Sequence, residues 1–414
     1  MSPFKTSIRP SHLVIAGHLT AFLILVATCD FKSKETPLTG VVHFTGQEFA
    51  GSESCAACHA SIADSHQHTP HYLTSAIADT TSVDGSFSPG ENVLVLNDRI
   101  KVVMQQSDSG LYQRAFVDGT EVENKRMDIS IGSGRKGQTF LYWDDHALFQ
   151  LPVSYYAQGD SWSNSPGYPP DQLVFDRSIP ARCLECHSTY MKTEKLIAGK
   201  ETFDANQMML GVDCERCHGP AGDHVRFHRE HPNEKEARAV INPGNLSRQQ
   251  KLDNCALCHS GIRENLMPSF SYTVGEKLED YSFPSYPADS GATLDVHGNQ
   301  YGLLLASKCF KMSDMDCSSC HNVHLKETNQ LSKFSTRCMS CHTSGGPHFC
   351  TQPPMPGLVI EENCIDCHMP SLPSRQVFVR SATNPKPVSF FARTHLIGIY
   401  DHKVEEYLKT IATK

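Results

Sequence analysis

The sequence predicts a fold of α-helices and irregular loops, with a β-rich insert between its first two Cys-x-x-Cys-His motifs. Three observations support this fold class. The motif occurs seven times in 414 residues. Only 39% of the residues are hydrophobic and two are Trp, so the core made by the polypeptide itself is expected to be thin. Residues 60–182 contain no such motif, and within them short apolar and polar runs alternate between turn residues, as in β-strands.

Each Cys-x-x-Cys-His copy is typical of c-type haem attachment. The two thiols bond to the porphyrin and the adjacent His becomes the proximal iron ligand. Structural zinc also uses Cys-x-x-Cys pairs, but it does not require a His directly after every second Cys. We therefore expect seven covalently bound c-type haems and a multihaem cytochrome c fold of α-helices and irregular segments organised around packed haems. The predicted attachment residues are Cys55, Cys58, Cys183, Cys186, Cys214, Cys217, Cys255, Cys258, Cys317, Cys320, Cys338, Cys341, Cys364 and Cys367. The predicted proximal ligands are His59, His187, His218, His259, His321, His342 and His368.

The N-terminal residues resemble an export signal, expected to span residues 1–28. Lys5 and Arg9 precede the apolar stretch 13–28. This stretch ends at Cys29 in a pattern that resembles a lipoprotein cleavage site, so Cys29 is the predicted lipidation site. A plain cleaved signal and an uncleaved membrane anchor are the alternatives. All three place the rest outside the cytoplasm, in the periplasm or at the cell surface, and lipidation would attach it to a membrane.

The remaining chain divides by composition and motif density. We expect a polar tether at 29–50, a first haem segment at 51–85 with a helix near 60–80, and the β-rich insert at 86–178. A six-haem domain at 179–400 and a C-terminal helix at 401–414 follow, with irregular backbone at its Pro-rich stretches, including 385–387. Residues 132–137 match Gly-x-Gly-x-x-Gly, but strand-like flanks favour a hairpin over a dinucleotide site. Cys309 and Cys350 lie outside the motifs, and the sequence leaves open a disulfide or two free thiols.

The acidic charge bears on partners. The formal net charge is −8 and becomes −10 if the leader with Lys5 and Arg9 is removed. This balance disfavours nucleic acid and favours redox proteins with basic docking patches.

The second axial ligand of each iron must come from the other histidines. The chain has 22 His, enough to supply every site with an imidazole. His66 and His68 are rivals of one candidate, His71, and His228 lies one helical turn from another, His224. The first and fourth motifs lack an obvious nearby distal His, so an open iron would be sought there. His43, His146, His231 and His402 are weaker candidates. The preferred distal ligands are His71, His224, His297, His324, His348 and His395.

Short sequence segments around the motifs resemble those of known families. Residues 51–55 with 69–71 resemble the first haem segment of cytochrome c554-like proteins, although Thr69 replaces a Ser and His66 a Trp of that pattern. Residues 183–189, 211–224, 316–324 and 364–370 are similar to multihaem cytochromes that are often fused to tetratricopeptide repeats. The resemblance implies bis-His haems, with better matches at His71, His224, His324 and His395 than at His297 and His348.

We expect an electron carrier rather than a substrate-converting enzyme. In this hypothesis the chain transfers electrons outside the cytoplasm through closely packed, mostly bis-His haems, with redox proteins as partners. One alternative is a reductase or oxidase of a small nitrogen or sulfur compound at one open-site haem; Cys-x-x-Cys-Lys, typical of pentahaem nitrite reductases, is absent from the sequence. Another is an electron-transfer subunit of a larger membrane redox complex.

Overall fold

The computed structural model describes residues 36–286, 293–353, 357–382 and 384–412. The chain divides into two compact units, Met1–Pro37 and Leu38–Lys414, and all seven motifs belong to the second. The expected signal segment and Cys29 lie outside the described residues. Among the helices of the described part, none combines the length and apolar character needed to cross a bilayer.

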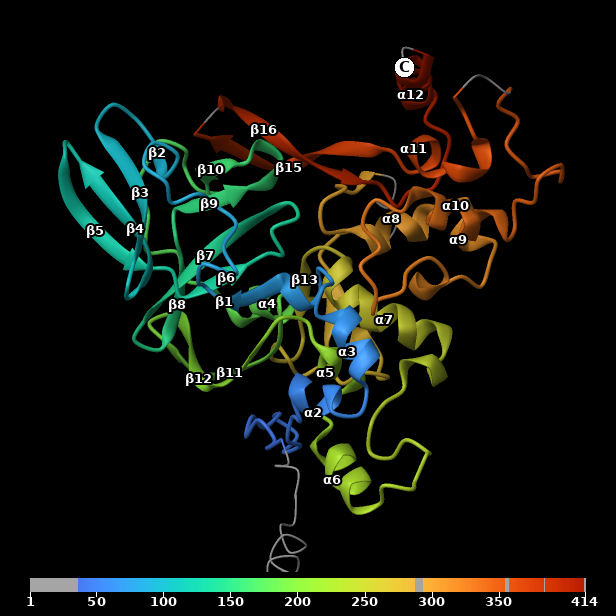
Figure 1. Cartoon of the computed structure of the whole chain (residues 1–414), viewed down its shortest axis with the longest axis horizontal. Coiled ribbons are helices and arrows are strands. Elements are labelled where there is room, and N and C mark those ends of the chain that lie inside the picture. The colour runs from blue at the N-terminus through green and yellow to red at the C-terminus, as the bar shows by residue number, and fades with distance from the viewer. Residues whose placement is uncertain (1–35, 287–292, 354–356, 383, 413–414) are drawn as a thin grey trace, which may run out of the picture. The chain divides into compact units, whose positions relative to one another are not determined.

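Residues 93–164 carry strands β2 to β10, on one side of the second unit (Figure 1). Antiparallel strands β2-β3-β4-β5 form one sheet, and a larger sheet has the order β1-β6-β7-β9-β10-β15-β16, with β8 paired to β7. Residues 132–136 connect β6 to β7 as a hairpin, as their flanking strands predict. The strands are β1 (Ser75–Ile77), β2 (Val93–Val95), β3 (Ile100–Ser107), β4 (Gly110–Val117), β5 (Thr120–Arg126), β6 (Ile129–Ile131), β7 (Gly137–Asp144), β8 (Ala147–Gln150), β9 (Val153–Tyr156) and β10 (Ser161–Asn164).

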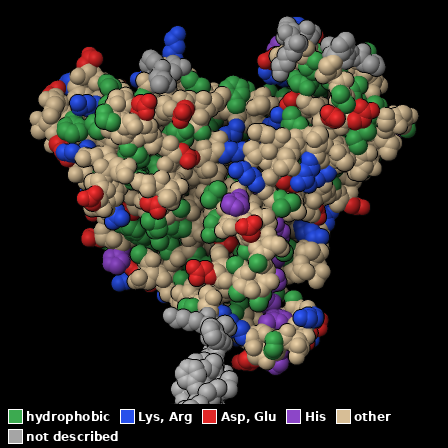
Figure 2. Space-filling view, in the orientation of Figure 1, with side chains coloured by type: hydrophobic (Ala, Val, Ile, Leu, Met, Phe, Trp, Pro, Cys, Tyr) green, Lys and Arg blue, Asp and Glu red, His purple; other side chains and the backbone are tan. Residues whose placement is uncertain are grey.

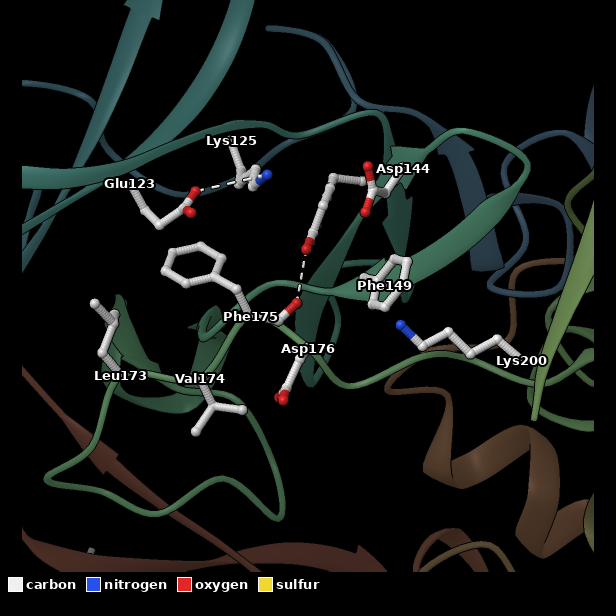
Figure 3. A pocket seen from close by; sticks show the side chains of 10 residues that line it. Glu123, Lys125, Asp144, Phe149, Leu173, Val174, Phe175, Asp176 and Lys200 are labelled. Carbon is white, nitrogen blue, oxygen red and sulfur yellow. Dashed lines mark hydrogen bonds and ion pairs between the residues drawn. The ribbon is translucent and has the colours of Figure 1, made fainter. Parts of the chain in front are cut away.

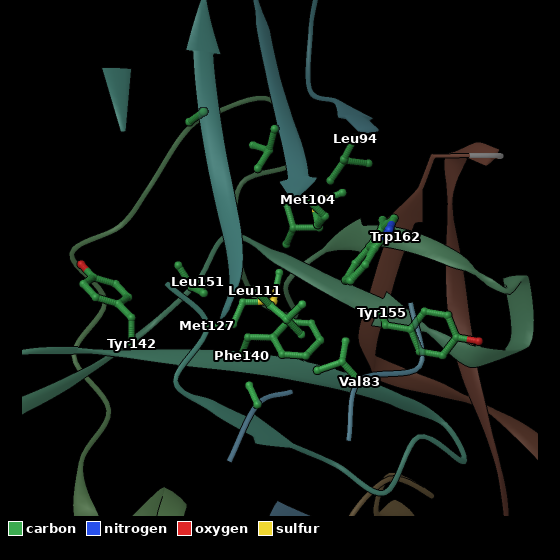
Figure 4. Close-up of a cluster of buried hydrophobic side chains, with 14 of the residues drawn as sticks. Val83, Leu94, Met104, Leu111, Met127, Phe140, Tyr142, Leu151, Tyr155 and Trp162 are labelled. Atoms are coloured by element: carbon green, nitrogen blue, oxygen red, sulfur yellow. The ribbon is translucent and has the colours of Figure 1, made fainter. Parts of the chain in front are cut away.

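An apolar core fills the space between these two sheets (Figure 4). Met104 of β3, Leu111 of β4 and Phe140 of β7 are at most 1% exposed, and Trp162 of β10 packs against Phe140. The side chain of Gln113 also points inward. It donates to the carbonyl of Val153 and accepts from its N–H, which satisfies the buried amide and ties β4 to β9.

Strand β7 buries both of its faces, because successive side chains of a strand point to opposite sides. Phe140 and Tyr142 belong to the core between the sheets. Leu141 belongs to a second core with Tyr190 and Phe203 of the β11–β12 hairpin. The β region is thereby joined through one strand to the part of the chain that carries the second motif.

Helices predominate in the other part of this unit, on the side opposite β2–β5 (Figure 1). The chain links them by loops, single 3-10 turns and β-hairpins. The α-helices are α2 (Ser52–Ala56), α3 (Ala60–His66), α4 (Ala181–Glu185), α5 (Cys214–His218), α6 (Gly222–Glu230), α7 (Arg248–His259), α8 (Gln300–Ala306), α9 (Lys308–Lys311), α10 (Leu331–Met339), α11 (Ile365–His368) and α12 (Asp401–Ala412).

β-Hairpins also occur beyond residue 179, where the sequence predicts only short helices and loops. One is β11 (Ser188–Ile197) with β12 (Lys200–Leu210), and a short one is β13 (Arg263–Asn265) with β14 (Ser282–Pro284). The third is β15 (Ser371–Ser381) with β16 (Asn384–Arg393), which contains the Pro residues expected to enforce irregular backbone. Because β15 pairs with β10, β16 lies at the sheet edge, where a strand tolerates Pro.

Two sequence predictions near the N-terminus are wrong. The predicted tether includes residues 38–50, but Val41 and Phe49 are 4% and 2% exposed and belong to the second core. The helix expected near 60–80 ends at His66, because Thr69 accepts the Tyr72 N–H and a 3-10 turn follows. Residues 67–75, named the strap below, follow this early end as turns and the 3-10 turn Tyr72–Thr74.

Candidate haem sites

The motifs lie at helix ends or form short helices themselves. The 12-residue helix α7 begins with a capping box between Ser247 and Gln250 and ends at His259, so it carries the whole fourth motif in its last turns. Helix α5 consists of the third motif, and the carboxylate of Asp213 accepts the N–H of Cys214 at its start. In a helix, residues three apart share a face, so both thiols of a motif project toward one side.

The Nδ1 atoms of five motif histidines face an oxygen acceptor. The Nδ1–H donates to the carbonyl of Ile241 from His218 (2.9 Å), of His348 from His342 (2.7 Å) and of Gly398 from His368 (2.9 Å). Nδ1 of His187 faces Thr74 Oγ1 at 3.0 Å, and that of His259 faces Gln300 Oε1 at 3.4 Å. These contacts fix each ring and leave its Nε2 free, which is how proteins orient histidine ligands to a metal.

Three motif histidines lie opposite histidines that are remote in sequence. Ring centroids are 6.0 Å apart for His71 and His259, and 6.3 Å apart for His218 and His324. His321 and His395 are also separated by 6.3 Å. Two imidazoles that bind one metal at about 2 Å through Nε2 place their centroids about 6 Å apart. The spacing of the three pairs therefore fits an iron between the rings, and His71 supplies the partner that the fourth motif was expected to lack.

Local contacts place these remote histidines. The strap is fixed by His71, whose carbonyl accepts the Val212 N–H, and by Ser75, which bonds Gly211 and the His187 carbonyl. The buried hydroxyl of Ser307 donates to the carbonyl of His395 and accepts the N–H of Ile397. The segments that carry His71 and His395 are thus each held by a hydrogen bond to the backbone carbonyl of the histidine.

Burial keeps the distal imidazoles neutral. It lowers the pKa of His71 to about 4, with a smaller contribution from the neighbouring His259. It also lowers the pKa of His395 to about 4, with His321 as the second cause. A metal binds the unprotonated imidazole, so these shifts favour ligation at neutral pH.

The other predicted distal histidines are placed less decisively. His297 is near enough to His187 to lower its pKa, after the larger effect of burial, but the two rings are not in contact. His224 donates from Nδ1 to the Arg238 carbonyl and packs against His228 on α6, where histidines gather at the surface (Figure 2). His348 meets the sixth motif through its backbone carbonyl. Among the described residues, the rings of His59, His342 and His368 have no imidazole at the 6 Å spacing.

Weaker or rival histidines have other contacts. His66 directs both ring nitrogens at backbone carbonyls, of Val323 and Val212, and is 8% exposed. His43 is held by Thr45 and the Phe270 carbonyl. These contacts join segments of the fold, and the ring of His66 also lies 6.1 Å from that of His324 between centroids.

The cysteines of different motifs lie beside one another. The side-chain pairs are Cys55 with Cys214, Cys186 with Cys258, Cys255 with Cys317, and Cys338 with Cys364. The fourth motif therefore touches both the second and the fifth. Cys309 and Cys350 are free thiols in the structure, with Cys309 close to Cys341 and Cys350 close to Cys367.

Two buried carboxylates inside the motifs were not predicted from the sequence. Glu215 of the third motif accepts the N–H groups of Ala50, Gly51 and Ala221, and burial raises its pKa despite these bonds. Glu185 of the second motif accepts the N–H of Phe270 and pairs with Arg182. An acidic residue at a motif's variable position was the available signal. Both carboxylates join one motif to a distant segment.

An open groove of about 480 Å³ lies apart from these residues on the β region (Figure 3). Its lining includes Glu123, Asp144 and Asp176 beside Lys125 and Lys200, and the hydroxyl of Tyr142 at its wall bonds to the Phe175 carbonyl. None of the lining residues is a predicted haem ligand.

Comparison with known proteins finds similarity to multihaem cytochromes. The family model described as cytochrome c554 and c-prime matches residues 171–219, which include the second and third motifs. A multiheme cytochrome, MtrA of Shewanella baltica (strain OS185), is 27% identical over 195 residues. Over these stretches the chain is similar to multihaem c-type cytochromes. The match covers 45% of this chain and 45% of that relative, and no solved structure matches.

The residues present fit haem c. Each motif supplies two thiols and one oriented imidazole, and three motifs face a second imidazole at the spacing of two axial ligands. The buried Nε2 of His228 has no hydrogen-bond partner, an arrangement that is costly for a buried polar atom without a ligand.

Proposed function

We propose that this cytochrome is an electron carrier with seven covalently bound haems, most of them held between two histidines. The observation that carries the proposal is the set of three histidine pairs with centroids 6.0–6.3 Å apart. Each pair joins a motif histidine to a residue from another segment, which is what bis-imidazole coordination requires. A haem iron with two imidazole ligands supplies reversible one-electron chemistry without an open coordination position.

Each ligand residue has a role in this proposal. His259, His218 and His321 are proximal ligands, and His71, His324 and His395 complete their sites from the strap, the loop after the fifth motif and the loop after β16. His297 is the proposed partner of His187, because the two are close and the loop of His297 is fixed by Asp295, which bonds Ser374 and Arg375. His224 and His348 are proposed ligands of the remaining sites.

The contacts between motifs support transfer through the molecule rather than isolated redox centres. The fourth motif touches the second through Cys258 and the fifth through Cys255. Neighbouring cofactors attached at such contacts would be close enough for rapid electron exchange. We propose redox proteins as partners and a location outside the cytoplasm, with Cys29 as the lipid attachment site and a larger redox complex as an alternative setting.

The first motif supports a second candidate function. His59 has no paired imidazole among the described residues, and its side chain is exposed. An iron held there by one histidine would have an open position, which a reductase or oxidase of a small nitrogen or sulfur compound needs.

Electron paramagnetic resonance of the ferric protein, with haem quantified by mass, tests the two functions. An electron carrier is expected to bind seven haems, all low-spin and unchanged by nitrite or hydroxylamine. His71→Ala should convert one haem to high spin, whereas His68→Ala, a change at an exposed neighbour, should convert none. A wild-type high-spin signal that moves with nitrite would favour the enzyme.

A further inference from the structure

Glu327 brings a buried carboxylate to the histidine of the fifth motif. Its Oε2 lies 3.7 Å from Nδ1 of His321, and its side chain is 7% exposed whereas that of His321 is 48% exposed. The carboxylate therefore approaches the ring from the protein side and leaves Nε2 on the opposite side of the imidazole. The ring of His395 lies 6.3 Å from that of His321 between centroids, with the two ring planes 28° apart.

Three donors fix the carboxylate in this position. Arg337 donates to Oε1 at 2.7 Å, Lys333 lies 3.0 Å from Oε1, and the N–H of Asn322 donates to Oε2 at 3.0 Å. Lys333 and Arg337 are one turn apart on α10, the helix that leads into the sixth motif. A carboxylate that binds an Arg, a Lys and a backbone N–H has little freedom to rotate away from the imidazole.

A charged partner at Nδ1 distinguishes this motif from five of the others. Neutral oxygens occupy the same position beside five motif histidines: backbone carbonyls for His218, His342 and His368, a hydroxyl for His187 and an amide for His259. Nδ1 of His321 therefore has a fully charged carboxylate beside it, whereas Nδ1 of these five histidines has the dipole of a neutral group. Carboxylate partners of this kind raise the basicity of a ligating imidazole.

We propose that Glu327 is a positioning residue that lowers the reduction potential of the fifth haem. The inference rests on the proposed function, because it takes His321 as an iron ligand. A more basic imidazole and a nearby negative charge both stabilise the ferric state relative to the ferrous state. Lys333 and Arg337 act in the opposite direction, so removal of one cation should lower the potential further.

A potentiometric titration of the full holoprotein, followed by electron paramagnetic resonance, tests the proposal. Glu327→Gln should shift the ferrous-to-ferric ratio of one haem about tenfold toward ferrous at fixed potential, about 59 mV for one electron. Lys333→Gln should shift the same haem the other way. Glu327→Asp, which keeps the charge, should recover part of the effect, and the exposed control Glu279→Gln should change none.

The outcomes distinguish a failure of the role proposed for Glu327 from a failure of the proposed function. A normal haem count with all potentials unchanged in Glu327→Gln would overturn the role of Glu327 and leave the electron-carrier proposal intact. Absence of low-spin signals from the wild-type protein would instead overturn the assignment of the histidines as axial ligands. If Glu327→Gln does not fold, Lys333→Gln decides, because an unchanged or raised potential in that variant contradicts the proposal.

Discussion

The β region and the motif-rich region of this chain are packed in different ways. Residues 93–164 bury Met104, Leu111, Phe140 and Trp162 at 0–1% exposure between two sheets. Beyond residue 293, the buried hydrophobic residues of the described chain are few and scattered: Val296, Leu303, Phe310, Ile365 and Val379. We infer that the β region is completed by its own side chains, whereas the part beyond residue 293 would depend on the apolar surface of the proposed porphyrins.

The largest expected effect comes from preventing one central haem attachment. Cys255→Ser with Cys258→Ser removes the fourth attachment, and this motif touches both the second and the fifth. We expect residues 179–400 to be cleaved at least about tenfold faster by a protease, because the region loses a buried cofactor, while residues 93–164 stay resistant. Limited proteolysis with mass spectrometry measures both.

The matched control for this variant is the last motif. Cys364→Ser with Cys367→Ser should open only the segment near α11 and α12. Equal sensitivity of the β region and the motif-rich region in the first variant would contradict the comparison.

Truncation of a side chain in the β core should have the second-largest effect. Phe140→Ala removes a fully buried ring that packs against Trp162, and we expect a loss of about 3–5 kcal/mol in the free energy of unfolding of this region. Val95→Ala, at 62% exposure, should change it by less than about 0.5 kcal/mol. Denaturant unfolding followed by near-ultraviolet circular dichroism compares them, and similar values would mean that no continuous core exists.

Replacement of the Glu215 carboxylate should lower the stability by less than the Phe140 truncation. Glu215→Gln replaces one acceptor oxygen by an amide that cannot accept the N–H bonded there, so about 1–3 kcal/mol of stability should be lost. Glu230→Gln on the exposed end of α6 is the control. Thermal unfolding of the holoprotein measures the difference, and unchanged stability would show that the third motif does not need this connection to residues 50–51.

Tyr142 should give the smallest effect and a pH dependence. Burial, and then the charges of Asp144 and Glu123, raise the pKa of Tyr142 to about 12 from 10.0. The stability linked to this raised pKa is fully present below pH 10 and is lost as the pH rises toward 12. Tyr142→Phe should cost about 1 kcal/mol at neutral pH, because the bond to Phe175 is lost, and should remove this part of the alkaline loss. Tyr112→Phe is the control, and denaturant unfolding between pH 8 and 12 tests the prediction. An unchanged alkaline loss would refute it.

The sequence predicts the local structure of this chain, but it predicts few of the contacts between distant segments. Strand alternation and turn residues predict the strands near 93–117, and the motif spacing predicts the cofactor class. Pairings such as His71 with His259 could not be predicted, because they depend on a strap released by the early end of α3. The Pro-containing strand β16 was missed because an edge position, which tolerates Pro, is a tertiary property.

Hydrogen exchange of the full chain, made with and without haem attachment, tests the central comparison most directly. We predict that the amides of β3, β4 and β7 stay protected in both forms, because their core contains only side chains. The amides of α10 and α11 should be protected only in the haem-containing form. Protection of α10 and α11 without haem would contradict the inference that porphyrins complete the part of the chain beyond residue 293.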